Sequence, residues 1–187
     1  MRALQLIGAC WMAFVAYWIV SAQSVKPTAE RQGIGAQVSH LALLAVGATL
    51  LAGLWRSDPL DMRVMSRGLA TDICGVVLCL LGLVVAIWAR RTLAGNWSSS
   101  VNLKQGHELI QRGPYGYVRH PIYSGLLLMF LGTAVAIGRL DAWLGTLVCA
   151  LGFWIKLRQE EALMMRHFPD AYRSYRRNVK ALVPFVF

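Results

Sequence analysis

The chain has 187 residues, of which 57% are hydrophobic and only 15% charged, and its net charge is +10. A soluble protein of this length cannot bury so much apolar surface, because its surface-to-volume ratio limits the core, so the excess must face lipid. The basic residues do not run in blocks, which argues against nucleic-acid binding and favours loops drawn to anionic lipid headgroups. The four cysteines lie inside apolar stretches without metal or redox spacing, so we expect buried thiols and no metal site.

Five apolar stretches predict transmembrane helices, each of which needs roughly 20 residues to cross a bilayer. They run from about residue 4 to 22, 38 to 55, 71 to 89, 122 to 137 and 142 to 155. The last two are short and closely spaced, which predicts a tight C-terminal helical hairpin. The first lacks a convincing cleavage site, so we interpret it as a retained helix. We therefore expect an all-α, polytopic membrane protein forming one domain over residues 1–187, with three spans in residues 1–92.

The distribution of basic residues predicts the orientation of these spans. With five crossings, fourteen of the 19 lysines and arginines fall on the side of the C-terminal tail. Cytoplasmic loops carry the excess of Lys and Arg, so the C-terminus is expected in the cytoplasm and the N-terminus outside. In a prokaryote this membrane would be the inner, cytoplasmic one.

The polar segment from 104 to 125, between the third and fourth stretches, combines two histidines, several tyrosines and a lysine with turn-forming glycines and prolines. Pro121 suits the first position of the following helix, where a missing N–H is harmless. Arg119 and His120 are thereby placed at the positive end of a membrane helix, which attracts carboxylates or phosphates. Arg119 is explained equally well as an anchor on the cytoplasmic side. His107 and His120 favour a loop that cradles a ligand.

A second polar segment follows the fifth stretch. Leu157 and Met164 belong to an apolar stripe at helical spacing, and Glu161 falls on the same stripe. A carboxylate on a buried face must be paired or must bind a cation. Glu160 is four residues after Lys156, so it is either a functional group or half of a helix-stabilising ion pair.

Together the two segments resemble the isoprenylcysteine carboxyl methyltransferase family, in the compact form of its prokaryotic members, over about the last hundred residues. The resemblance is carried by Gly113-Pro114-Tyr115, Arg119-His120-Pro121-Ile122-Tyr123-Ser124-Gly125 and Glu160-Glu161. It implies that residues 93–187 form a cofactor-binding and catalytic part, with S-adenosylmethionine bound between a cytoplasmic loop and a helix. The implied cofactor contacts are Lys104, His107, Leu109, Ile110, Tyr115, Arg119, His120, Pro121, Tyr123, Glu160 and Glu161.

The resemblance also implies a catalytic group near the glutamate pair, in which Lys156 or Arg158 would hold a lipophilic or lipidated acceptor of the prenylcysteine type. A carboxylate acceptor needs only such a cationic clamp. An amine acceptor must first lose a proton, for which Glu160 or His120 would be the base.

Three alternatives stay open at this point. The first is a phospholipid or amine N-methyltransferase, the second an NADPH-dependent reductase of the sterol type, and the third a non-enzymatic membrane scaffold. The reductases generally have more spans than this chain has room for.

Overall fold

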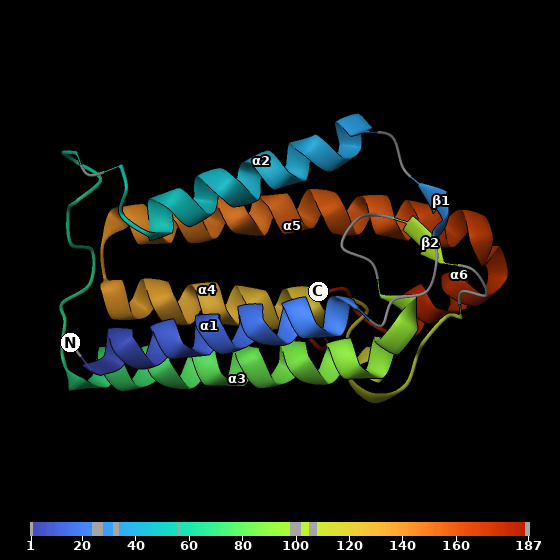
Figure 1. The fold of residues 1–187 in the computed structure, drawn as a ribbon, viewed down its shortest axis with the longest axis horizontal. Helices are drawn as coiled ribbons and strands as arrows, with labels where there is room; N and C mark the ends of the chain where they lie inside the picture. Colours follow the sequence, from blue (N-terminus) through green and yellow to red (C-terminus); the bar gives the residue numbers. More distant parts are fainter. Residues whose placement is uncertain are drawn as a thin grey trace.

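The computed structural model describes residues 2–23, 28–31, 34–55, 57–97, 102–104 and 108–185. Within these residues five long helices run up and down beside one another and a shorter sixth lies at one end (Figure 1). The helices are α1 Arg2–Ala22, α2 Ile34–Leu51, α3 Leu69–Leu93, α4 Pro121–Ile137, α5 Leu140–His167 and α6 Pro169–Asn178. The expected helical membrane fold is confirmed.

Short elements join these helices at the end where α6 lies. Strands β1 (Thr28–Arg31) and β2 (Asn102–Lys104) form a two-stranded antiparallel sheet. Two 3-10 turns, η1 (Ala94–Asn96) and η2 (Gly113–Gly116), lie between α3 and α4 in the chain. The strands are the one addition to the helical architecture expected from the sequence.

Four of the five expected apolar stretches lie wholly within long helices, whereas the second, expected over residues 38 to 55, runs past the end of α2 at Leu51. Helices α1, α3 and α5 are long and apolar enough to cross a membrane, whereas the apolar parts of α2 (Val38–Leu51) and α4 are shorter. The hairpin of α4 and α5 is present and turns at Gly138, whose φ of 70° suits a residue without a side chain. Helix α5 differs from the expectation, since it continues unbroken for 28 residues. Glu160 and Glu161 therefore lie on the fifth span's own helix.

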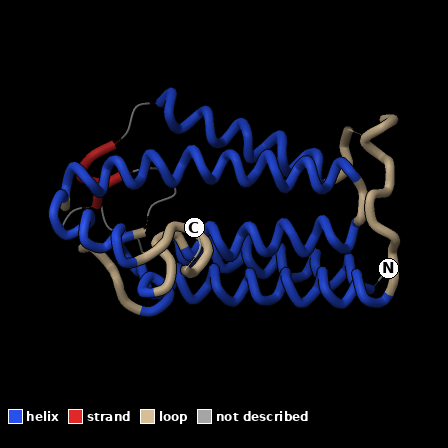
Figure 2. The backbone as a smooth tube through the Cα atoms, turned by 180° about the vertical axis from the view of Figure 1, so that it is seen from behind, coloured by secondary structure: helices blue, strands red, loops and turns tan. Residues whose placement is uncertain are grey.

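The helices form two groups. Helix α1 packs with α3 and α4, and α2 packs with α5, as the two opposite views agree (Figures 1 and 2). Glycines let the backbones touch within each group: a Cβ on Gly125 of α4 would lie 2.6 Å from the carbonyl oxygen of Gly82 on α3. A Cβ on Gly145 of α5 would lie 2.6 Å from the carbonyl oxygen of Gly47 on α2. Small residues at such contacts are typical of membrane helices.

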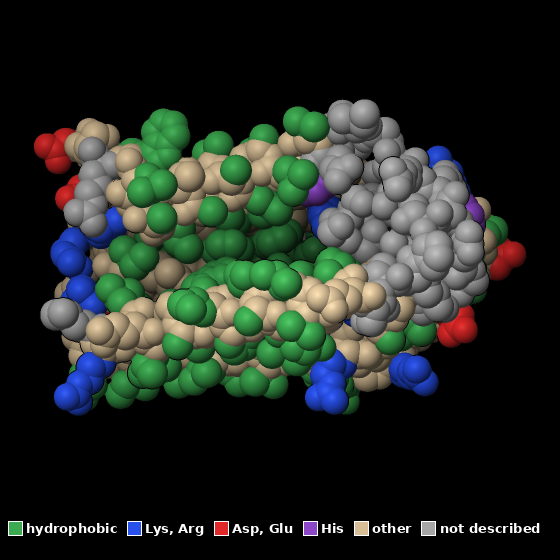
Figure 3. Space-filling model, in the orientation of Figure 1, with side chains coloured by type: hydrophobic (Ala, Val, Ile, Leu, Met, Phe, Trp, Pro, Cys, Tyr) green, Lys and Arg blue, Asp and Glu red, His purple; other side chains and the backbone are tan. Residues whose placement is uncertain are grey.

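The surface between the two groups is hollowed. In the space-filling view the hollow lies between α2 and α1 and is lined by hydrophobic side chains (Figure 3). On the outer sides of the bundle, large apolar residues such as Met12 and Leu81 are exposed, as expected for surfaces that face lipid. The bundle is therefore tight within each group and open between them.

A buried arginine closes the site end of the α1–α3 pair. Arg90 is only 2% exposed, and its guanidinium donates to the carbonyl oxygens of Ala94 (2.8 Å) and Ser21 (2.5 Å). The same guanidinium lies 4.6 Å from the centre of the Trp97 ring. Arg90 thus ties the C-terminal ends of α1 and α3 together, where helix dipoles favour a cation.

Candidate active site

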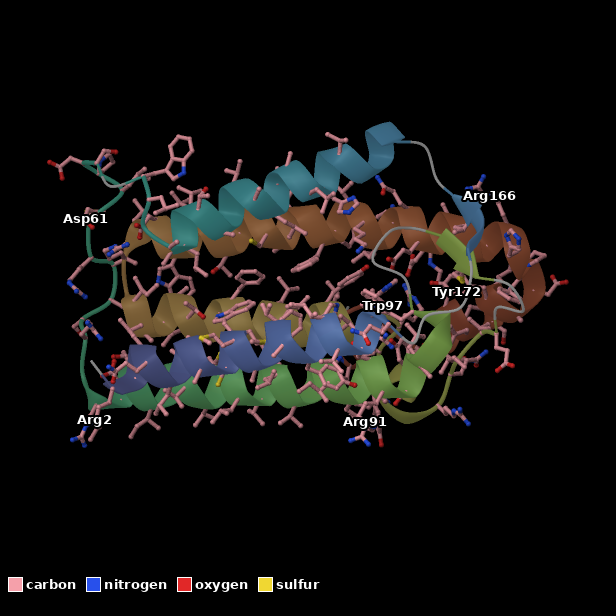
Figure 4. All side chains as sticks on the ribbon, in the orientation of Figure 1. Arg2, Asp61, Arg91, Trp97, Arg166 and Tyr172 are labelled. Carbon is pink, nitrogen blue, oxygen red and sulfur yellow. The ribbon has the colours of Figure 1, made fainter. Side chains whose placement is uncertain are left out.

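A cavity of about 500 Å³ lies between the two helix groups, a size typical of sites for small organic molecules. One end of it is polar and the rest is apolar. The polar or charged residues that line it are Glu108, Tyr115, Arg119, His120, Tyr123, Lys156, Glu160, Tyr172 and Tyr175. The sticks in Figure 4 show Trp97 and Tyr172 at this end of the molecule, far from Arg2 and Asp61 at the other.

The N-terminal end of α4 is held in place by backbone contacts with the chain that follows α6. The backbone N–H of Arg119 donates to the carbonyl oxygen of Lys180 (2.8 Å), and that of His120 donates to Ala181 (3.0 Å). Pro121 occupies the first turn of α4, as expected, and is buried. Arg119 and His120 are therefore fixed in position where the polar loop meets α4.

Glu161 is committed to an internal ion pair. Its Oε1 accepts hydrogen bonds from Nε (2.8 Å) and Nη2 (2.5 Å) of Arg119, and lies 3.4 Å from Nε2 of His120. Its Oε2 lies 3.6 Å from Nε of Arg176 on α6. The carboxylate is almost fully buried and does not line the cavity in the described part of the chain. Glu161 therefore joins α4, α5 and α6, and its contacts provide no face toward a ligand.

Glu160 faces the cavity. Its Oε1 accepts a hydrogen bond from the Tyr123 hydroxyl (2.5 Å), and its Oε2 lies 3.6 Å from Nδ1 of His120. The Tyr123 ring is stacked between His120 and Phe153, with ring centres 5.6 Å and 5.2 Å away. These contacts hold a carboxylate and two aromatic faces in one orientation at the cavity wall.

The protonation of His120 follows from its neighbours. Burial lowers the pKa of His120, but the carboxylates of Glu160 and Glu161 outweigh burial, so the pKa lies above its usual value. A charged imidazole has two N–H donors and no lone pair to accept a proton. Because its pKa is raised, His120 favours the protonated form and is better suited to binding the two glutamates than to acting as a base.

Lys156 and Arg158, the two candidates for holding an acceptor, lie in different places. Lys156 lines the cavity, and its Nζ lies 5.5 Å from the centre of the Tyr123 ring. Arg158 is exposed, with its guanidinium 5.2 Å from the centre of the Trp154 ring, and does not line the cavity. Of the two, the structure brings only Lys156 to the candidate site.

The remaining expected contacts divide similarly. Leu109 and Ile110 line the cavity. Pro121 does not line it, because its ring packs into the start of α4. Lys104 lies in β2, and His107 lies outside the described residues, so their roles stay predictions.

The apolar lining was not anticipated. Trp11 and Trp18 of α1, together with Trp97, form an aromatic wall, and Trp11 donates from Nε1 to Oγ1 of Thr133 (3.0 Å). Phe130 packs on Trp11 with ring centres 4.8 Å apart. By residue type alone these side chains cannot be told from lipid-facing ones. The available signal was the helical spacing of Trp11, Phe14 and Trp18 along the first span.

Comparison with known proteins gives consistent matches. The sequence model of the family described as phospholipid methyltransferase matches residues 70–171, more than half of the chain. The protein-S-isoprenylcysteine O-methyltransferase of Saccharomyces cerevisiae is 30% identical over 132 residues, which cover 67% of this chain and 55% of that protein. The protein of the same name from Schizosaccharomyces pombe is 34% identical over 84 residues, covering 43% and 34%.

A solved structure agrees with the sequence relatives. A eukaryotic intramembrane Ras methyltransferase, isoprenylcysteine carboxyl methyltransferase, superimposes with a TM-score of 0.57 and 25% identity, over 81% of this chain and 51% of that one. The chain thus spans only about a third to a half of the length of these relatives. The family model extends from α3 through α5, so the chain belongs to the phospholipid methyltransferase family, among relatives that are isoprenylcysteine carboxyl methyltransferases.

Proposed function

We propose that this integral membrane protein transfers a methyl group from S-adenosylmethionine to the carboxylate of a lipophilic acceptor of the prenylcysteine type. The observation that carries the proposal is the cavity's division into a polar end, with Glu160, Tyr123 and Lys156, and an apolar arm that continues between α1 and α2. A cavity divided in this way suits two ligands. The polar end fits a polar, cationic cofactor, and the apolar arm fits a lipophilic acceptor whose carboxylate reaches the polar end.

The residues at the polar end fit the proposed cofactor. When bound, S-adenosylmethionine supplies a methyl group on a positively charged sulfur. A cation of this kind is stabilised by aromatic faces and by a carboxylate. Glu160 supplies the carboxylate, and the rings of Tyr115, Tyr172 and Tyr175 line the same cavity. The carboxylate of Glu160 is held by Tyr123 and His120, so it need not rearrange when a cation enters.

The acceptor's carboxylate would be held by Lys156. Its ammonium lines the polar end beside Tyr123, on the same side of the helix as Glu160 four residues later, whereas the other lining guanidinium, Arg119, is bound to Glu161. A carboxylate is already a nucleophile, so the protein's task is to position it and exclude water. The raised pKa of His120 agrees with this, since a carboxylate acceptor requires no general base.

The apolar arm would hold the acceptor's hydrocarbon chain. Phe14, Leu44, Ala48, Leu126 and Phe130 line it, and the hollow of Figure 3 opens between α1 and α2. A lipophilic chain could enter sideways from the bilayer while the polar cofactor arrives from the α6 end. The names of the relatives support a prenylcysteine, because those proteins are isoprenylcysteine O-methyltransferases.

An amine acceptor is the second candidate, favoured by the family's description as phospholipid methyltransferase. It would require Glu160 to take a proton, which its hydrogen bond from Tyr123 and its ion pair with His120 oppose. The carboxylate acceptor therefore has the better support from the site.

The membrane orientation completes the proposal. Both polar segments lie at one end of the bundle, and the excess of basic residues there supports an orientation with that end in the cytoplasm. A reporter fused after Phe187 should report the cytoplasm, and one fused before Met1 the opposite side. The same compartment for both would refute the five-crossing arrangement.

Ligand binding by the purified protein tests the function. Calorimetry should show binding of S-adenosylmethionine and S-adenosylhomocysteine and no binding of NADPH. With the cofactor present, an S-farnesylated N-acetylcysteine should be methylated, and its carboxamide should not. Binding of NADPH alone would refute methyl transfer, and methylation of phosphatidylethanolamine in place of the cysteine derivative would favour the amine acceptor.

A further inference from the structure

Helix α6 carries its three arginines on one flank, and Asp170 lies in its first turn. Tyr172 and Tyr175 are buried against the rest of the protein. Arg173, Arg176 and Arg177 are spaced three and four residues apart and therefore share another side of the helix, where all three are exposed. Along the described residues, no carboxylate pairs with Arg173 or Arg177.

The depth of this flank can be estimated from α5. That helix begins beside the charged pair Arg139 and Asp141, which we take as the far membrane boundary. From Leu140 to Glu161 it rises about 32 Å, close to the hydrocarbon thickness of about 30 Å. Arg176 contacts Glu161 (3.6 Å between Nε and Oε2), so the C-terminal turn of α6 lies at the level of the lipid headgroups.

Helix α6 also forms part of the cavity wall. Tyr172 and Tyr175 both line the cavity, and the Tyr175 hydroxyl donates to the carbonyl oxygen of Tyr115 (2.5 Å). Figure 4 shows Tyr172 at the same end of the molecule as Trp97. The position of α6 therefore affects the shape of the candidate site directly.

We propose that the arginine flank of α6 binds anionic phospholipid headgroups of the surrounding bilayer, and that this contact seats α6 and tightens binding at the cavity. Charge complementarity selects the partner, because three arginines at headgroup depth face a leaflet whose anionic lipids attract such clusters. The headgroup contact stands on geometry and charge alone. The effect on cofactor binding rests on the function proposed above.

The test uses the full chain in nanodiscs of phosphatidylcholine, with and without phosphatidylglycerol. Phosphatidylglycerol should slow amide hydrogen exchange across residues 170–178 and tighten binding of S-adenosylhomocysteine. Each exposed arginine should contribute roughly fivefold to the lipid preference, and added salt should weaken the effect. Arg173→Gln with Arg177→Gln should remove most of both responses. The matched control is Arg2→Gln with Arg67→Gln at the opposite end, which should keep both.

Three outcomes would overturn the inference. The first is slowed exchange in the Arg173→Gln, Arg177→Gln variant equal to that of the wild type. The second is the same response produced in phosphatidylcholine discs by inorganic phosphate, which would assign the flank to a soluble anion. The third is slowed exchange with S-adenosylhomocysteine affinity unchanged, which would refute the coupling. Absence of S-adenosylhomocysteine binding in every bilayer, with the exchange response intact, would instead refute the proposed function and support the lipid contact.

Discussion

Helix α4 meets α3 along one side and α5 along the other, and the two contacts differ in kind. Against α3 the backbones touch through Gly82 and Gly125, which leave no space between the helices. Against α5 the cavity separates the two helices, and polar contacts join them at its edge, chiefly Arg119 with Glu161 and Tyr123 with Glu160. The tight contact gives α4 a rigid support, so the open one can be shaped for ligands.

Breaking the buried ion pair should have the largest effect. Arg119→Met leaves the Glu161 carboxylate buried without its main partner, which typically costs about 3–5 kcal/mol of stability. Unfolding followed by circular dichroism in detergent should show it. Arg119→Met combined with Glu161→Leu should recover part of the loss, because no uncompensated charge remains. If the Arg119→Met variant is as stable as the wild type, the ion pair does not stabilise the fold.

Filling the tight contact should have the next largest effect. A Cβ on Gly125 would lie 2.6 Å from the carbonyl oxygen of Gly82, so Gly125→Ala must push α3 and α4 apart. Overpacking of this kind costs about 1–3 kcal/mol, measurable as a lowered Tm. The control is Gly8→Ala on α1, where nothing lies within 4 Å of the new carbon. Equal Tm values for the two variants would show that the contact is not close-packed.

Neutralising Glu160 should separate the two adjacent glutamates. Glu160→Gln removes a charge facing the cavity, so it should weaken binding of the cationic S-adenosylmethionine about 10–100-fold and that of the uncharged-sulfur product S-adenosylhomocysteine much less. Glu161→Gln acts through the fold and should weaken both ligands equally. Calorimetry on both variants makes the comparison. Equal losses for both ligands in Glu160→Gln would contradict its role beside the sulfonium.

Removing the cavity lysine should affect the acceptor and spare the cofactor. Lys156→Met should raise KM for an acidic acceptor about tenfold while leaving S-adenosylmethionine affinity nearly unchanged. Arg158→Met is the matched control, since Arg158 lies outside the cavity. Turnover assays with both variants decide between the two cations. If neither affects turnover, the acceptor is not a carboxylate.

The smallest effect should be the pH dependence of the stability that His120 contributes through Glu160 and Glu161. The pKa of His120 is raised by Glu160 and Glu161, so its contribution to stability is complete below its unfolded pKa of about 6.5 and is lost as pH rises through the folded value. Tm should therefore fall on the alkaline side in the wild type more than in His120→Gln. Parallel pH profiles would show that His120 is uncharged in the folded protein.

The sequence predicts local features of the fold better than contacts between distant segments. Helices follow from local apolar runs, so the five long helices and the hairpin were predictable. The stripe around Leu157 correctly indicated that Glu161 is buried, and a buried carboxylate needs a partner. That the partner is Arg119, 42 residues away, depends on how α4 and α5 meet, which no local pattern encodes.

The site was predictable where a motif carried it and unpredictable elsewhere. Tyr123, His120 and Glu160 were expected at the site and do lie together at the cavity, although their roles stay predictions. Trp11 and Trp97 were not expected, because every face of a membrane helix is apolar and the pattern does not reveal which side faces a cavity. Lys156 and Arg158 were inseparable for a related reason: both are cations near one helix end.

Arg90 has a consequence for how the cavity behaves across conditions. It is buried against the carbonyl oxygens of Ser21 and Ala94 and the Trp97 ring, none of which gains or loses a proton. The opposite wall depends on His120 and two carboxylates, which do. Acid or alkali should therefore weaken the contacts of the cavity wall that contains His120 and the glutamates, and should leave the wall around Arg90 and Trp97 unchanged. A ligand that contacts mainly the tryptophan wall should stay bound at pH values at which a ligand bound mainly to Glu160 dissociates.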